Sequence, residues 1–236
     1  MCIRDSFNPV RDVNLRLSYS SGFRAPQAFD EDMHIENVGG TVAMIERAKD
    51  LKEEKSQSFS ASADMYHRFG AFQTNLLIEG FYTRLTDVFV LGEPYDRGDG
   101  ILVKTRSNGP GAKVMGLTLE GKVAYLSILQ IQAGLTLQRS RYDEPHKWHD
   151  DAPAEKKIFR TPDTYGYFTA TCTPIKPLSI ALSGTYTGRM LVQRMDITAE
   201  NAELGEMPER KAEAIRTPRF FDLGVKLAYD LSLIHI

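Results

Sequence analysis

The sequence predicts an all-β fold, part of an antiparallel transmembrane β-barrel, on three observations. Apolar and polar residues alternate with a period of two, the connections between these segments are short and long in turn, and most polar positions hold Gln, Ser, Thr, Asn or Gly. Successive side chains of a strand point to opposite faces of a sheet, so each alternating segment indicates a strand with one apolar face. Gln, Ser and Thr suit a face that lines a water-filled lumen.

The first four expected strands cover residues 12–21, 55–67, 71–92 and 101–123. Strand 12–21 alternates from Val13 to Tyr19 with polar residues between, and strand 55–67 alternates Phe59, Ala61, Ala63 and Met65 with serines. Strands 71–92 and 101–123 are longer than the roughly 9–11 residues that cross a bilayer. We therefore expect these two to project well beyond the membrane.

The last four expected strands cover residues 127–142, 163–173, 178–192 and 217–229. In the first of these, apolar residues from Leu129 to Leu137 alternate with Gln, Gly and Thr. Strand 163–173 lies between Pro162 and a turn, strand 178–192 opens with Leu178, Ile180 and Leu182, and strand 217–229 alternates from Phe221 to Leu227.

The connections alternate in length along the chain. Short turns are expected at residues 67–71, 124–127 and 173–177, and longer loops at 22–54, 93–100, 143–162 and 193–216. Membrane barrels show this rhythm because their periplasmic turns are short and their extracellular loops are long. A soluble β-sandwich also alternates, and the pattern alone leaves that alternative open.

Composition excludes several classes of protein. The 236 residues are 42% hydrophobic and 25% charged, which excludes a mostly disordered chain. No apolar run approaches the roughly 18 residues of a membrane-spanning helix. With 29 basic and 31 acidic residues the net charge is −2, so we expect no nucleic-acid partner. The sequence has neither a phosphate-binding glycine motif nor G-x-S-x-G, and we expect no catalytic residue, no cofactor and no enzyme activity.

The two ends of the chain fit one inverted DNA sequence. The last six residues, 231–236, can be encoded as CTG TCT CTT ATA CAC ATC, whose reverse complement, read one base in, encodes the opening Met1–Asp5 followed by Ser or Arg. This DNA resembles the transposase recognition end used in library preparation. We expect residues 1–6 and 231–236 to be adapter-derived and residues 7–230 to be native.

Six segments, in order along the chain, resemble the barrel domain of TonB-dependent outer-membrane receptors. They are Gly22–Pro26 (GFRAP), Leu51–Ser56, Glu79–Asp87, Asn108–Glu120, which resembles the family's "N-x-x-x-A-x-x-x-G-x-E-x-E" strand, and the pair Arg160–Pro162 and Tyr186–Met190. Glu53 stands where the family often has Pro. The matching order covers nearly all of residues 7–230.

The resemblance implies a barrel of about 22 strands plugged by a separate globular domain, of which this chain would supply about eight strands. It further implies import of a scarce nutrient across the outer membrane. The cargo would be a small molecule or metal chelate: a ferric siderophore, haem, cobalamin or a glycan. Outer-membrane lipid would surround the wall. TonB would act through the plug, and we expect the plug and the TonB box to lie outside this chain. A small structural or adhesive outer-membrane barrel and a soluble β-sandwich binding domain are the alternatives.

Individual ligand residues are harder to predict. The stretch from His146 to Asp151 has two imidazoles, one indole and two carboxylates in a loop that follows an expected strand. Imidazole and carboxylate groups can bind metals or metal chelates, so His146, Trp148 and His149 are the candidate ligand contacts of an extracellular loop. No helix is expected to fix their geometry in this Pro-flanked loop, and we expect no metal site.

Overall fold

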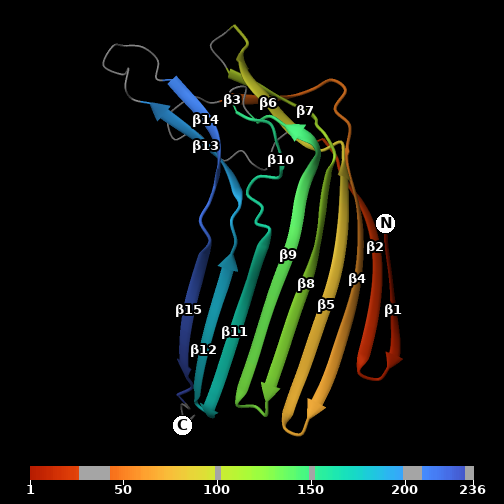
Figure 1. Ribbon diagram of the computed structural model, residues 1–236, viewed down its shortest axis with the longest axis vertical. Helices are drawn as coiled ribbons and strands as arrows, with labels where there is room; N and C mark the ends of the chain where they lie inside the picture. Colours follow the sequence, from red (N-terminus) through yellow and green to blue (C-terminus); the bar gives the residue numbers. More distant parts are fainter. Residues whose placement is uncertain (27–42, 99–101, 149–151, 199–208, 232–236) are drawn as a thin grey trace, which may run out of the picture.

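A computed structural model describes residues 1–26, 43–98, 102–148, 152–198 and 209–231. Its main element is a ten-stranded sheet with the order β1-β2-β4-β5-β8-β9-β11-β12-β15, in which β10 also pairs with β9 (Figure 1). All these pairs are antiparallel. The strands are β1 (Cys2–Val10), β2 (Val13–Arg24), β4 (Glu54–Phe69), β5 (Phe72–Thr86), β8 (Ala112–Tyr125), β9 (Leu129–His146), β10 (Glu155–Lys157), β11 (Thr164–Ile175), β12 (Leu178–Thr187) and β15 (Phe220–Tyr229).

We call the main sheet the wall. At one end of its strands, the turn end, the connections are all tight turns. The turns join β1 to β2, β4 to β5, β8 to β9 and β11 to β12, at residues 11–12, 70–71, 126–128 and 176–177. Gly70 takes a positive φ of 57° in the second turn, a conformation that costs glycine little. The long connections lie at the opposite end of the strands, which we call the loop end (Figure 1). The predicted rhythm of short and long connections is confirmed.

Two smaller sheets lie at the loop end. The first contains β3 (Ala43–Arg47), β6 (Phe89–Asp96) and β7 (Leu102–Asn108), and its β3–β7 pair is parallel. The second is the antiparallel pair of β13 (Leu191–Thr198) and β14 (Glu209–Arg216). The described residues include no helix long and apolar enough to cross a membrane.

The prediction of single strands over 71–92, 101–123 and 178–192 is wrong, because each of them breaks at the loop end. Strand β5 stops at Thr86, and Asp87 follows with a φ of 55°, outside the range that a strand allows. The Asn108 amide donates to the Asp87 carbonyl at 2.8 Å and holds this break in place. The segments beyond the breaks, β6, β7 and β13, pair in the smaller sheets instead. Strand β1 was not predicted, since the first strand was expected at 12–21 and residues 1–6 were expected to be adapter-derived.

The wall is more exposed on its apolar face than on its polar face. Along β9, Leu135 and Leu137 are 41% and 46% exposed, whereas Thr136 and Ser140 are 7% and 2% exposed. Along β4, the serines at 56, 58, 60 and 62 are all half-buried. Side chains crowd together on the concave side of a curved sheet, so the polar face is the concave one. If the convex face met water, that face would be polar and the concave face apolar. The apolar convex face therefore indicates a wall whose convex side meets lipid.

An Arg on the apolar face will therefore cost far more than an Arg on the polar face. Leu135→Arg should destabilise the folded protein by about 2–4 kcal/mol, because it places a charge in the lipid-facing band. The matched change Thr169→Arg lies on the polar face and should cost less than about 1 kcal/mol. Urea titration of the protein in lipid vesicles measures both. Equal costs at the two positions would contradict the assignment of the faces.

Candidate functional site: the polar face of the wall

Strand pairing gathers charged and hydrogen-bonding side chains on the polar face near the turn end. The register sets Asp64 opposite Asn14 and Leu77, Glu120 opposite Leu77 and Gly134, and Gly134 opposite Tyr167. Directly paired residues share a face, so side chains from six strands meet in one area. We call this group the inner polar network; it consists of Arg16, Asp64, Tyr66, Asn75, Glu120, Lys122, Gln132 and Tyr167.

Glu120 is the centre of one half of the inner polar network. The Tyr167 hydroxyl donates to Glu120 Oε2 at 2.6 Å, and Lys122 Nζ lies 2.9 Å from Glu120 Oε1. The Gln132 amide donates to the Tyr167 oxygen at 2.7 Å. Strands β8, β9 and β11 are thereby joined by side chains as well as by their backbone ladder. Hydrogen bonds to a charged group are about twice as strong as neutral ones, so these contacts hold the Glu120 and Tyr167 side chains in position.

Asp64 is the centre of the other half. This carboxylate is 7% exposed and accepts hydrogen bonds from the Tyr66 hydroxyl, at 3.0 Å, and from the Asn75 amide. Arg16 lies 3.6 Å away on β2. A buried carboxylate needs such partners, because leaving it unpaired would cost several kcal/mol. Asp64 therefore ties β2, β4 and β5 together on the polar face.

Two glycines make room for aromatic rings on the same face. A Cβ atom at Gly134 would lie 2.5 Å from Tyr167 Cε1, and one at Gly116 would lie 2.6 Å from Phe81 Cζ. Each ring lies over the backbone of the neighbouring strand, an arrangement used in sheets to cover glycine. The ring of Tyr167 reaches Glu120 because Gly134 has no side chain.

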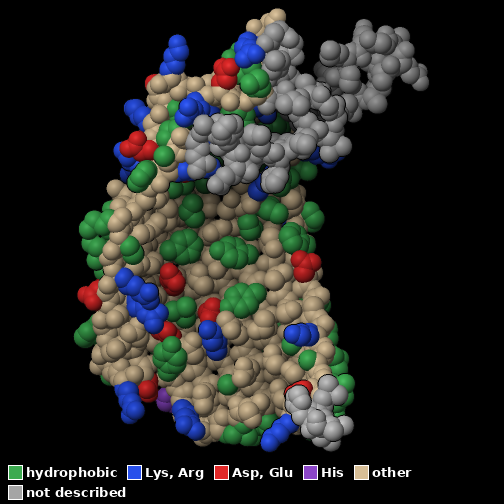
Figure 2. All heavy atoms as spheres, turned by 180° about the vertical axis from the view of Figure 1, so that it is seen from behind, with side chains coloured by type: hydrophobic (Ala, Val, Ile, Leu, Met, Phe, Trp, Pro, Cys, Tyr) green, Lys and Arg blue, Asp and Glu red, His purple; other side chains and the backbone are tan. Residues whose placement is uncertain are grey.

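The chemistry of this face is hydrogen bonding and charge balance. The network has two cations, Arg16 and Lys122, and two carboxylates, Asp64 and Glu120, each in contact with opposite charge. Hydroxyl pairs extend the polar surface toward the loop end, with Ser18–Ser60 at 2.7 Å and Ser58–Thr83 at 2.9 Å. Charged side chains of both signs appear in the middle of the wall in Figure 2. Such a surface can form hydrogen bonds with a polar protein surface or with water.

The predicted ligand residues lie at the loop end, away from this network. His146 ends β9 half-buried, with its ring 5.6 Å from the ring of Tyr142. Trp148 packs edge-on against Phe159, with ring centroids 6.2 Å apart. His149 lies outside the described residues. Both described residues thus make local aromatic contacts, and their role as ligand contacts stays a prediction.

Metal-ligating side chains are scattered in the part of the chain that the structure describes. No three His, Cys, Asp or Glu residues there lie close enough to hold a metal ion. Burial lowers the pKa of the His146 imidazole, so the neutral form is favoured at the loop end.

A family model described as "TonB dependent receptor-like, beta-barrel" matches residues 6–233. The chain belongs to this family. A comparison with curated protein sequences finds no match.

Solved structures share the fold of this family member. The FrpB iron transporter from Neisseria meningitidis is 15% identical with a TM-score of 0.63, and the match covers 97% of this chain and 32% of that one. The siderophore receptor PirA from Acinetobacter baumannii is 13% identical with a TM-score of 0.64, covering 98% and 34%. A ferric enterobactin receptor from Pseudomonas aeruginosa, PfeA, is 15% identical with a TM-score of 0.62, covering 98% and 33%. The chain spans about a third of the length of these structures.

The TonB-dependent receptor barrel fold explains both faces of the wall. It is an outer-membrane fold in which the convex side meets lipid and the concave side lines a lumen that a globular domain plugs. The polar network, which sequence reasoning missed, lies on the concave side of the wall. The signal for part of it was present, since Gly116 and Glu120 belong to the Asn108–Glu120 segment that resembles the family strand.

Filling the space at Gly134 should break the Glu120 half of the network. Gly134→Val should destabilise the protein by about 1–3 kcal/mol, because the new side chain displaces the Tyr167 ring from Glu120. The control is Gly121→Val, where an added Cβ meets no atom within 4 Å. Urea midpoints of the two variants in lipid vesicles give the comparison. Equal midpoints would show that the Tyr167 contact contributes nothing.

The loop end should lose stability in acid through His146. Because the folded-state pKa is lowered, the unfolded loop binds more protons, so stability is full above pH ~6.5 and falls as the pH drops below that value. Local unfolding in urea can be followed by the fluorescence of Trp148. Its contribution is obtained by subtracting the fluorescence of the Trp148→Phe variant. His146→Gln should abolish the acid loss. An unchanged acid loss in that variant would assign the effect to another group.

Proposed function

We propose that this chain is a segment of the wall of an outer-membrane receptor that imports a scarce nutrient with energy transmitted by TonB. The observation that carries the proposal is the family match over residues 6–233. The exposed apolar face and the half-buried polar face support the same conclusion, because they suit lipid outside and a lumen inside.

The orientation follows from the connections. Short turns lie on the periplasmic side of such barrels and long loops lie outside the cell. The turn end would then face the periplasm, and the loop end would meet incoming cargo. The inner polar network lies near the turn end, where it would face the plug through which TonB acts.

A ferric siderophore is the cargo that we favour. PirA is described as a siderophore receptor, PfeA as a ferric enterobactin receptor and FrpB as an iron transporter. These proteins share the fold of this chain at 13–15% identity, which supports a cargo class and no individual ligand. The family consists of transport receptors, and we propose that this protein is likewise no enzyme.

We also propose that residues 7–230 are native and that 1–6 and 231–236 are adapter-derived. Asp5 supports this division, since it pairs with Leu17 and so lies on the apolar face. A carboxylate there would meet lipid, where a charge is costly.

Contiguous DNA from the source sample tests the receptor proposal first. The reading frame should continue upstream of Phe7 into a plug domain and a signal peptide, and downstream of Asp230 into further strands. A natural start and stop codon close to these residues would overturn the proposal, and a small barrel would replace it.

Uptake measurements then test the cargo. Cells lacking the complete gene should grow poorly on a ferric siderophore as the sole iron source and should take up less radiolabelled chelate. Removing TonB from cells that keep the gene should cause the same loss. Normal siderophore uptake together with lost growth on haem, cobalamin or a glycan would transfer the assignment to that cargo.

A further inference from the structure

Two long connections of the wall are joined to each other at the loop end. The first leads from β2 to β4 and contains β3, and the second is the hairpin of β6 and β7 between β5 and β8 (Figure 1). Strand β3 pairs in parallel with β7, from Ala43 opposite Leu102 to Arg47 opposite Arg106. The two connections therefore share one small sheet, although each leaves the wall at a different place.

The Asn108 side chain makes a second junction between the same two connections. Asn108 ends β7, and its Oδ1 accepts a hydrogen bond from the Lys52 N–H at 2.8 Å. Its Nδ2 donates to the Lys52 carbonyl at 3.0 Å and to the Asp87 carbonyl at 2.8 Å. A side-chain amide has one acceptor oxygen and two N–H donors, and all of them are used here. One half-buried side chain thus holds the approach to β4, the end of β5 and its own hairpin together.

The backbone around this junction is closely packed. The Gly109 N–H donates to the Val88 carbonyl at 2.7 Å, and the Phe89 N–H donates to Glu54 Oε2 at 3.0 Å. A Cβ atom at Gly109 would lie 2.5 Å from Val90 Cγ1, so only glycine permits this approach. Backbone groups with hydrogen-bond partners open less readily than free linkers do. The base of the hairpin is therefore held against the wall.

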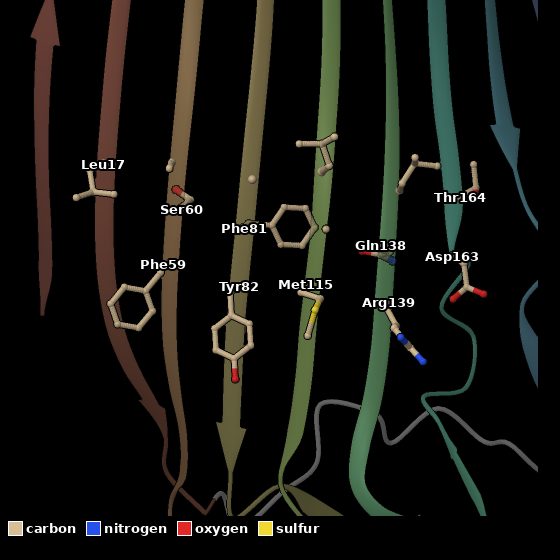
Figure 3. Close-up of a pocket in the computed structure, with 15 residues that line it drawn as sticks. Leu17, Phe59, Ser60, Phe81, Tyr82, Met115, Gln138, Arg139, Asp163 and Thr164 are labelled. Atoms are coloured by element: carbon tan, nitrogen blue, oxygen red, sulfur yellow. The ribbon is translucent and has the colours of Figure 1, made fainter.

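The wall next to the junction is regular. Phe59, Tyr82 and Met115 occupy directly paired positions on β4, β5 and β8 (Figure 3). The pairing of β5 with β8 continues without a shift to Leu85 opposite Ala112, where the hairpin leaves. The junction thus rests on an unbroken part of the sheet.

We propose that Asn108 is a positioning residue for cargo binding, which holds the two connections as one rigid unit on the loop end of the wall. Cargo then meets both segments in a fixed relative position, and they are ordered on folding instead of on binding. Losing the Asn108 contacts weakens binding of cargo and leaves the later steps of import unchanged. The inference rests on the proposed function, because that proposal assigns the loop end to incoming cargo.

Hydrogen exchange of the complete receptor tests the junction without any cargo. In Asn108→Ala the amides of β3 should exchange at least about tenfold faster than in the wild type, because three hydrogen bonds are lost. Asn108→Asp keeps the shape and the acceptor but directs a carboxylate oxygen at two carbonyl oxygens, so it should act like Asn108→Ala. Amides of β8 and β9 should keep their wild-type rates. Unchanged exchange of β3 in both variants would overturn the proposal.

The matched control is Gln138→Ala. The Gln138 amide donates to the Pro162 carbonyl at 2.9 Å, so it also holds a segment at the loop end. That segment belongs to the connection that follows its own strand, β9, and the contact joins no second connection. Gln138→Ala should therefore leave the exchange of β3 within about twofold of the wild type. Faster exchange of β3 in this control would assign the effect to general loosening of the loop end and overturn the proposal.

Uptake kinetics separate positioning from a general loss of structure. For the cargo that supports growth, Asn108→Ala should raise KM at least about tenfold and leave maximal uptake within about twofold of the wild type. Adding Ile45→Cys and Lys104→Cys places thiols at directly paired positions of β3 and β7. Their disulfide should restore the low KM, and dithiothreitol should abolish the rescue. An unchanged KM, a loss confined to maximal uptake, or a disulfide that forms without lowering KM would overturn the proposal.

Folding and fractionation checks separate the two proposals. Heat-dependent gel mobility confirms that each variant is folded before exchange or uptake is measured. A folded wild type that is found outside the outer membrane and imports nothing would refute the proposed function and, with it, the role of Asn108 in cargo binding. A receptor that imports its cargo, with Asn108 variants that match the wild type in exchange and in KM, would refute this inference alone.

Discussion

Backbone hydrogen bonding is the constraint on which the rest of the structure depends. A segment surrounded by lipid must satisfy its N–H and C=O groups within the protein, and strand-to-strand ladders do so for a barrel. Apart from the short β10, every strand of the main sheet from β2 to β12 has partners on both sides. Once the ladder is fixed, side chains alternate between lumen and lipid. The polar Thr136 and Ser140 are then more buried than the apolar Leu135 and Leu137, the reverse of a water-soluble fold.

The sequence predicted the fold class because alternation and loop length are local signals. The Asn108–Glu120 segment illustrates how far such signals reach. Asn108 bonds to both the N–H and the C=O of Lys52, Ala112 is buried, Gly116 lies under Phe81, and Glu120 joins the polar network. Ala112, Gly116 and Glu120 follow one another four residues apart in β8 and share its polar face, whereas Asn108 ends β7. A motif that resembles a family strand thus corresponds to one contact at the end of β7 and to three positions on the polar face of β8.

The polar network, the break in the strand at Asp87 and the contacts at the loop end could not be predicted. The physical reason is different for each of them. Glu120 and Tyr167 meet only because of the register of three strands, and no local pattern encodes that register. The break at Asp87 depends on a left-handed backbone held by Asn108, 21 positions later, while β-forming residues continue on either side. At the loop end, the sequence pointed to His146 and Trp148 for their chemistry, whereas the structure packs each against an aromatic neighbour.

The hairpin of β6 and β7 leaves the wall at Asp87 and rejoins it at Ala112, with its own ladder from Phe89 opposite Asn108 onward. Among the described residues, the hairpin pairs with β3 and with no strand of the main sheet, so its length can change without shifting the register of β5 against β8. During evolution this hairpin can therefore become longer or shorter, or be replaced, while the strand pairing of the wall stays the same. Relatives can then differ at the loop end while the pairing of the wall stays the same.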